Sequence, residues 1–315
     1  MVKEQLIKGI NDGDLRTLSK AITLAESSVQ EKHNLALDII EHFGPQTDTF
    51  RIGITGTPGV GKSTFIDAAG KQIAKDSKKL AVLSIDPSSS ITGGSILGDK
   101  TRMSALTSME NVYIRPTASG SQLGGLARNT RLAMLLCEAA GYKNIIIESV
   151  GVGQGETEIK QLSDLFVLLI NPGAGDELQG IKRGIMEVAD ILLVNKADGD
   201  LANIARQTAK EYSMALHHKP DSTKQWNPKT LITSATENIG INKFWETASD
   251  YHKTIVGNGW KSENRTKQMS YWANKNLQLY ILQRIDNYNA EVTELVGKGE
   301  LPEKIALKLF NKNFN

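Results

Sequence analysis

The feature that most constrains the fold is a glycine-rich stretch that ends in lysine and serine. Residues 56–63 read GTPGVGKS, which matches the pattern GxxxxGK[ST] without deviation. An apolar run, RIGIT, precedes the stretch, and a helical sequence, FIDAAGKQIAK, follows it. Such a loop needs a strand before it and a helix after it, because backbone N–H groups and the helix N-terminus face the bound anion together. The sequence therefore predicts a phosphate-binding loop at a strand–helix junction.

Two side chains of this loop carry the predicted chemistry. We expect Lys62 to reach the β- and γ-phosphates of a nucleotide, and the hydroxyl of Ser63 to bind Mg²⁺. The alternative, a glycine-rich connection with a chance lysine, leaves the flanking strand and helix unexplained. The predicted loop consists of Gly56, Thr57, Pro58, Gly59, Val60, Gly61, Lys62, Ser63 and Thr64.

From about residue 50 to 257, short apolar runs alternate with helical segments. This alternation predicts an α/β fold, a P-loop NTPase with a mainly parallel sheet that helices cover on both faces. Ligands of such sheets gather at the carboxyl ends of the strands, where several of these runs end in Asp, Glu or Asn. The predicted strands are RIGIT, LAVLSID, NVYIR, NIIIES, LFVLLIN, ILLVN and TLITS.

Helical sequence flanks this central region on both sides. We predict three parts: an N-terminal helical segment (1–47), a nucleotide-binding domain (48–257) and a C-terminal helical arm (258–315). In the arm, apolar residues at three- and four-residue steps predict one apolar stripe along a helix. A helix packed on its own core is the alternative to an interaction surface. The stripe consists of Leu277, Ile281, Ile285, Tyr288, Val292 and Leu295.

Three acidic residues are candidates for the metal side of the site. Asp86 ends the run LAVLSID, Asp99 lies in the Gly- and Ser-rich stretch that follows, and Glu148 ends the run NIIIES. Glu148 and Gly151 have the spacing of the [DE]xxG element, in which the carboxylate holds Mg²⁺ and the glycine N–H meets the γ-phosphate. Carboxylates near one phosphate loop repel one another unless a cation lies between them. Taken singly, each acid is also compatible with a helix cap or a solvated turn, and for Asp99 both readings stay open.

The residue after the switch glycine departs from a common GTPase pattern. Many GTPases have a glutamine there that orients the attacking water, but this chain has Val152, and Gln154 lies two positions later. We therefore expect slow intrinsic turnover, with a partner or a conformational change completing the site.

The base-recognition motif follows the run ILLV. Asn195, Lys196 and Asp198 form the pattern NKxD. The carboxylate of Asp198 can accept hydrogen bonds from N1–H and the exocyclic amine of guanine, whereas adenine lacks these donors in that geometry. Further along, Ser234 and Ala235 follow the run TLI and form an SA-type loop whose N–H groups can meet the O6 atom of guanine. Their order after the phosphate loop predicts GTP and GDP, with Mg²⁺, as the ligands.

The composition excludes several other classes. Lys plus Arg total 37 and Asp plus Glu total 35, a formal charge of +2, so charge gives no case for nucleic acid or an anionic membrane as the main partner. No apolar run approaches the ~20 residues that span a bilayer, and the N-terminal sequence lacks an apolar signal-peptide region. A single cysteine, Cys137, fits a reducing compartment. We expect a cytoplasmic protein in which Cys137 is a buried, unreactive side chain.

The assembled motifs resemble the GTPases that chaperone adenosylcobalamin-dependent acyl-CoA mutases, chiefly methylmalonyl-CoA mutase (the MeaB, ArgK and MMAA type). The resemblance covers about residues 10 to 310, and its long blocks are more specific than the phosphate loop. Where the family usually reads ETVGVGQSE, this chain has Ser149 for Thr and Gly155 for Ser. The blocks are GTPGVGKST, DPSSSITGGSILGDKTRM, RPTASGSQLGGLARNT, ESVGVGQGE, NPGAGDELQGIKRG and NKAD.

The resemblance implies a homodimeric GTPase of the signal-recognition, MinD and BioD (SIMIBI) class. It implies Asp86, Asp99 and Glu148 as the acidic metal set and a C-terminal dimerisation arm. The block NPGAGDELQGIKRG, with Asp176, Glu177 and Lys182, would then be a further switch that reports the nucleotide state to the mutase. The implied function is a chaperone that gates adenosylcobalamin loading and the protection or reactivation of the mutase.

Three other functions stay open at this stage. A GTPase metallochaperone for nickel enzymes needs Cys and His ligands, whereas this chain has one cysteine and five scattered histidines. A small-molecule kinase rarely carries NKxD and normally has an arginine-rich lid, which the sequence lacks. A nucleotide-gated scaffold with negligible catalysis is compatible with Val152.

Overall fold

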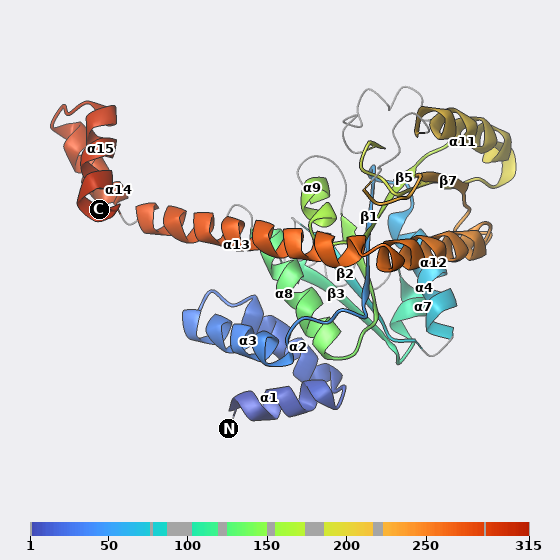
Figure 1. Cartoon of the computed structure of the whole chain (residues 1–315), viewed down its shortest axis with the longest axis horizontal. Coiled ribbons are helices and arrows are strands. Elements are labelled where there is room, and N and C mark those ends of the chain that lie inside the picture. Colours follow the sequence, from blue (N-terminus) through green and yellow to red (C-terminus); the bar gives the residue numbers. More distant parts are fainter. Residues whose placement is uncertain are drawn as a thin grey trace. The chain divides into compact units, whose positions relative to one another are not determined.

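Seven parallel strands form one sheet, in the order β3-β2-β4-β1-β5-β6-β7 (Figure 1). Every hydrogen-bonded pair of neighbouring strands runs parallel. All seven predicted strands occur, and the predicted α/β fold is confirmed. The strands are β1 (Phe50–Gly56), β2 (Leu80–Asp86), β3 (Val112–Ala118), β4 (Asn144–Ser149), β5 (Leu165–Ile170), β6 (Ile191–Val194) and β7 (Lys229–Ile232).

This computed structural model describes residues 2–75, 78–86, 103–118, 125–149, 155–173, 186–216, 223–286 and 288–314. The chain divides into two units, Met1–Asn264 and Arg265–Asn315. The first unit contains the sheet. The predicted boundaries at 47/48 and 257/258 stay predictions.

Helices cover both faces of the sheet. On one face lie α4 (Lys62–Lys75), the short α7 (Ser104–Thr107) and α12 (Ile241–Gly257), and on the other lie α8 (Gly125–Ala139) and α9 (Gly155–Lys160) (Figure 1). Burial on both faces explains why the strands are continuous apolar runs rather than alternating ones. The 3-10 turn η2 (Gly199–Leu201) leads into α11 (Ala202–Leu216), which contacts β6 and β7.

The main core lies between the sheet and the helices α4 and α12. The rings of Phe65 on α4 and Phe244 on α12 meet edge to face, with centroids 5.0 Å apart. The indole of Trp245 donates to the carbonyl oxygen of Ala69 at 2.9 Å and ties α12 to α4. Because α4 begins at the phosphate loop, this core sets the direction in which the start of α4 points.

Of the three N-terminal helices, α2 (Leu15–Ala25) and α3 (Gln30–Phe43) pack against α8, and α1 (Val2–Asn11) packs against α2 and α3. The Asp14 carboxylate caps α2 by accepting from the backbone N–H groups of Arg16 and Thr17. On α3, the imidazole of His33 lies 2.8 Å from the carbonyl oxygen of Ala25, and its other nitrogen lies 2.7 Å from the Arg128 guanidinium on α8. Since the guanidinium can only donate, Nε2 accepts and Nδ1 donates. The N-terminal helices are thus joined to α8 through a neutral imidazole.

A buried ion pair joins β1 to α8. The Arg51 guanidinium makes two hydrogen bonds to the Glu138 carboxylate, both 2.7 Å long, and Glu138 also accepts from the Thr49 hydroxyl. Glu138 is 1% exposed and Arg51 is 8% exposed. Burial and the neighbouring Arg51 charge lower the pKa of Arg131 to about 10. The Glu138 carboxylate therefore offsets part of the positive charge of two neighbouring arginines.

A second buried pair anchors the start of α13 (Trp260–Asp286) within the first unit. The Lys224 ammonium donates to the Asp190 carboxylate at 2.5 Å and lies 4.8 Å from the centre of the Trp260 ring. Asp190 also accepts from the backbone N–H of Phe166 on β5. The first turn of α13 is in this way attached to the sheet.

The second unit contains the rest of α13, α14 (Asn289–Gly297) and α15 (Pro302–Phe314). The prediction of one apolar stripe along a helix was wrong, because α13 ends at Asp286 and a new helix begins at Asn289. Leu295 packs with Ile305 and Leu309 of α15. In contrast, the α13 part of the stripe is exposed, at 58% for Leu277, 41% for Ile281 and 43% for Ile285. Among the described residues, no helix is both long enough and apolar enough to cross a membrane.

We expect Glu138→Gln to lower the free energy of unfolding by about 3 kcal/mol, because it leaves the Arg51 cation buried without its counter-charge. Urea unfolding measures the change. The matched control is Glu246→Gln, which removes an exposed partner of Lys243 and should cost less than about 1 kcal/mol. Equal losses in the two variants would contradict the assignment.

We expect His33 to make stability depend on pH. Burial and the neighbouring Arg128 cation hold the pKa of His33 below its ordinary value of 6.5. As pH falls below 6.5, the unfolded chain takes up a proton that the folded chain does not, so stability decreases until the folded pKa is reached. His33→Gln should remove this part of the slope in urea unfolding measured between pH 7.5 and about pH 5. The exposed His42, changed to Gln, is the control; an unchanged slope in His33→Gln would refute the expectation.

Candidate nucleotide-binding site

The predicted phosphate loop lies where β1 ends and α4 begins. β1 ends at Gly56 and α4 starts at Lys62, so the loop occupies the carboxyl edge of a central strand. The Lys62 ammonium folds back over the loop and donates to the carbonyl oxygens of Gly56 at 2.8 Å and Thr57 at 3.1 Å. Lys62 is 7% exposed. A largely buried cation therefore lies against the backbone of the loop, at the N-terminus of a 14-residue helix.

Two buried polar atoms beside the loop have no hydrogen-bond partner among the described residues. They are the Thr57 hydroxyl oxygen, within the loop itself, and the Asn171 side-chain carbonyl oxygen, just beyond the end of β5. β5 is the neighbour of β1 in the sheet. Buried polar atoms normally have partners, and an unpartnered one in a native structure points to a missing ligand or water. The Thr57 hydroxyl, in the loop that Lys62 contacts, can donate to an oxygen of an anionic ligand such as a phosphate chain, whereas the Asn171 oxygen can only accept from a donor such as water.

The strand order brings the predicted metal-side segments next to the phosphate loop. β4 lies between β1 and β2, so Glu148, at the end of β4, and Asp86, at the end of β2, follow neighbouring strands. Glu148 is 8% exposed and accepts a long hydrogen bond, 3.5 Å, from the Ser84 hydroxyl. The side chain of Asp86 and all of Asp99 and Gly151 lie outside the described residues.

The donor set is compatible with Mg²⁺. Within the described parts of the chain, no three His, Cys, Asp or Glu side chains cluster as a metal site. Mg²⁺ in nucleotide sites is usually held by one or two carboxylates or hydroxyls together with phosphate oxygens and water, so such a cluster is not required. Glu148 and Ser63 are hard oxygen donors on the two segments that flank the phosphate position. These residues fit Mg²⁺ bound together with a nucleotide.

The NKxD motif, the predicted base-recognition element, contacts the predicted phosphate loop directly. β6 ends two strands away from β1, and Asn195, the first residue after β6, donates through Nδ2 to the carbonyl oxygen of Val60 at 2.9 Å. Lys196 adopts a left-handed backbone conformation, with φ of 58°, and its ammonium donates to the carbonyl oxygen of Gly59 at 2.6 Å. Two side chains thus hold the loop after β6 against the loop after β1.

The SA-type loop after β7 contacts Asp198, the third residue of the NKxD motif that carries a predicted role. The Ser234 hydroxyl donates to the Asp198 carboxylate at 2.6 Å and accepts from the backbone N–H of Glu237 at 3.2 Å. The Thr233 hydroxyl donates to the Asn195 side-chain oxygen at 3.2 Å. The motifs NKxD and SA, which lie far apart in the sequence, therefore form one hydrogen-bonded group.

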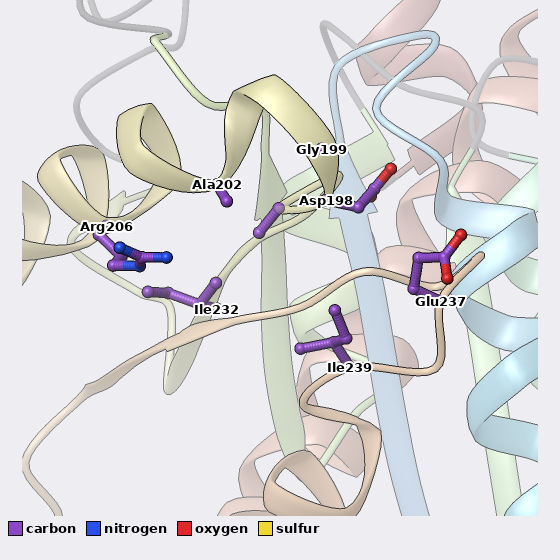
Figure 2. Close-up of a pocket in the computed structure, with 8 residues that line it drawn as sticks. Asp198, Gly199, Ala202, Arg206, Ile232, Glu237 and Ile239 are labelled. Carbon is purple, nitrogen blue, oxygen red and sulfur yellow. The ribbon is translucent and has the colours of Figure 1, made fainter.

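A pocket of about 630 Å³ opens beside Asp198 (Figure 2). The carboxyl groups of Asp198 and Glu237 project toward the same side, while Arg206 and Ile232 lie along another wall. Of the residues that line the pocket, the sequence motifs predict Asp198 but not Arg206 or Glu237. Ala202 and Arg206 are four residues apart on the helix after the motif, a spacing that places them on one face of that helix. The lining residues are Ala197, Asp198, Gly199, Ala202, Arg206, Ile232, Glu237 and Ile239.

Val152, Gln154, Asp176, Glu177 and Lys182 lie outside the described residues. Cys137 is buried, as expected. Burial raises the pKa of its thiol well above the ordinary range, which keeps it protonated and unreactive.

Comparison with known proteins agrees with the motifs. Residues 18–290 match the family described as "Methylmalonyl Co-A mutase-associated GTPase MeaB". The chain is 41% identical to GTPase ArgK of Escherichia coli K12 over 309 residues, covering 96% of this chain and 93% of the relative. It is 40% identical over 296 residues to the mouse "Methylmalonic aciduria type A homolog, mitochondrial", covering 90% of this chain and 71% of the relative. A crystal structure of an LAO/AO transport system kinase superposes with a TM-score of 0.77 and 32% identity, covering 98% of this chain and 96% of that one.

We expect Gly61→Ala to weaken nucleotide binding more than Gly59→Ala. Both glycines have positive φ, 93° and 77°, so alanine is strained at either position, by ~1–2 kcal/mol. A Cβ at Gly61 would also lie 2.7 Å from Asn195 Nδ2, whereas one at Gly59 would meet open space. Calorimetric titration with GDP measures both variants. Equal affinities would show that the close approach of Asn195 to the loop does not matter for binding.

Proposed function

The chain belongs to the family of methylmalonyl Co-A mutase-associated GTPases, and from this premise we propose that it is a GTP-dependent chaperone of an adenosylcobalamin-dependent acyl-CoA mutase. The family and its GTPase-named relatives make the chain a GTP hydrolase. The more specific role, gating cofactor loading and protecting or reactivating the mutase, rests on the family resemblance. Methylmalonyl-CoA mutase or a close relative is the proposed partner.

One observation carries the choice of guanine nucleotide. The loop with Asp198 is joined to the phosphate loop through Asn195 and Lys196, at 2.9 Å and 2.6 Å. A ligand whose phosphates lie on the loop of Lys62 therefore meets Asp198 at a set distance. A carboxylate in that place accepts from the N1–H and amino groups of guanine, and adenine would leave it without these donors.

The remaining residues support roles on the phosphate and metal side. Lys62 would neutralise the β- and γ-phosphates, and Ser63, Glu148, Asp86 and Asp99 would supply oxygen ligands for Mg²⁺. Bound Mg²⁺ would offset phosphate charge as the bond to the γ-phosphate breaks. Within this chain, the loop N–H groups would orient the phosphates, and the buried Lys62 would place its side-chain nitrogen beside them.

The nucleotide cycle would act through the segments that follow β2, β4 and β5. Glu148 and Gly151, and the block that contains Asp176, Glu177 and Lys182, are the proposed switches, ordered by the γ-phosphate and released on hydrolysis. We further propose a homodimer formed through the C-terminal arm (258–315), on which Leu277, Ile281 and Ile285 are exposed, and a cytoplasmic location.

The proposed function predicts guanine selectivity that depends on one carboxylate. Asp198→Asn should lower GTP affinity by at least about 100-fold and favour XTP, because the amide nitrogen can donate to the 2-oxo group of xanthine, whereas the amide has only one oxygen to accept from the two donors of guanine. Calorimetry with GTP, XTP and ATP tests this, with Glu246→Gln as an exposed control. Wild-type binding of ATP as tight as that of GTP would contradict the base assignment.

The partner needs a separate test. We expect retention of a cobalamin-dependent mutase from native extract when the chain is loaded with non-hydrolysable GTP, and faster GTP turnover when the purified mutase is added. Consistent recovery of a nickel enzyme would favour a metallochaperone instead. Turnover that stays negligible with the mutase present would favour a nucleotide-gated scaffold.

A further inference from the structure

The end of β4, which carries Glu148, is held from both neighbouring strands by side-chain hydroxyls. On the β2 side, Ser84 pairs in register with Glu148, so the two side chains lie on the same face of the sheet. The Ser84 hydroxyl donates to Oε2 of Glu148 at 3.5 Å. Ser84 is 2% exposed and Glu148 8%. The contact is long, but it aims a donor at the carboxylate in a place largely closed to water.

On the β1 side, the next residue makes a shorter contact. The hydroxyls of Ser149 and Thr55 lie 2.8 Å apart, and these residues are 4% and 0% exposed. Successive residues of a strand point to opposite faces, so this pair lies on the face opposite to Ser84 and the Glu148 carboxylate. The two contacts therefore hold the same strand end on its two faces.

The β1–β4 ladder shows why the second contact matters. Its last paired residues are Ile54 and Glu148, after which β1 continues to Gly56 and the phosphate loop. β4 remains paired with β2 through Ser149. On the β1 side, the Thr55–Ser149 hydroxyl pair extends the connection one residue beyond the ladder. It joins the strand that enters the phosphate loop to the residue that follows Glu148.

We propose that Ser84, Thr55 and Ser149 are positioning residues that hold the Glu148 carboxylate in place beside the phosphate loop. This inference rests on the proposed role of Glu148 on the magnesium side of the site. The three residues do not touch the nucleotide in this scheme. They set the position of a carboxylate that lies one residue before the end of β4, where the ladder to β1 stops and only the ladder to β2 continues.

The consequence is a specific defect in the response to magnesium. Loss of one buried hydrogen bond lowers the equilibrium constant for holding the Glu148 carboxylate in place by about three- to tenfold. The defect should appear in the Mg²⁺ concentration needed to retain nucleotide. Nucleotide affinity without Mg²⁺ should not change, because the phosphate loop and the base pocket are intact. A general loss of packing would instead weaken binding in both conditions.

The test measures release of a fluorescent GDP analogue from the full chain over a series of Mg²⁺ concentrations and in excess EDTA. We expect Ser149→Ala and Ser84→Ala to raise the Mg²⁺ midpoint about three- to tenfold. Ser149→Thr, which keeps the hydroxyl, should stay near the wild type. The matched control is Ser163→Ala, since Ser163 is a 3% exposed residue whose hydroxyl donates to the Ile159 carbonyl oxygen, before β5. Release rates in EDTA should agree among all variants.

Thermal unfolding checks that each variant is folded. If Ser84→Ala does not fold, the comparison of the Mg²⁺ midpoints of Ser149→Ala and Ser149→Thr tests the inference. Alanine variants that match Ser163→Ala, or that release nucleotide faster to the same extent with and without Mg²⁺, would overturn the inference alone. A wild type whose GDP release does not respond to Mg²⁺ would overturn the proposed magnesium-side role of Glu148, and this inference with it.

Discussion

The site depends on the contact between two loops at the carboxyl edge of the sheet. Asn195 and Lys196, after β6, donate to the carbonyl oxygens of Val60 and Gly59 in the phosphate loop after β1. Since β5 separates these strands, the contact is possible only because parallel strands end at a common edge. Gly61 leaves room for it, because a side chain there would collide with Asn195. The loop proposed to recognise the base and the loop proposed to bind the phosphates are therefore held together as one unit.

Behind this edge, buried polar contacts hold the helices in place. Glu138 receives two hydrogen bonds from Arg51 and one from Thr49, so α8 is attached to β1 and to the chain that precedes it. The Thr117 and Thr130 hydroxyls, 2.7 Å apart, attach α8 to β3 as well. Such contacts are directional, and partial loss leaves a buried group unpaired. They favour one arrangement of α8 rather than merely adding stability.

The two ends of the chain differ in how well periodicity described them. The N-terminal helices were expected from their pattern and occur, but no sequence motif predicts their attachment to α8 through His33 and Arg128. At the C-terminal end, a pattern with correct helical spacing ran across a helix boundary between Asp286 and Asn289. Periodicity records which residues are apolar along the chain. It does not record whether the chain reverses between them, and here Leu295 packs on α15 while Leu277 is exposed.

By itself the sequence determined the strands, the phosphate loop, and the NKxD and SA motifs, because each is a local pattern whose chemistry depends on neighbours in the chain. It also carried the family, through long blocks around these motifs. Only the tertiary structure decided which strands are adjacent, and therefore that Glu148 faces Ser84, that Ser149 meets Thr55, and that Glu237 shares a pocket with Asp198. The physical reason is that these contacts join residues tens of positions apart, and strand order and register, which no local pattern encodes, bring them together.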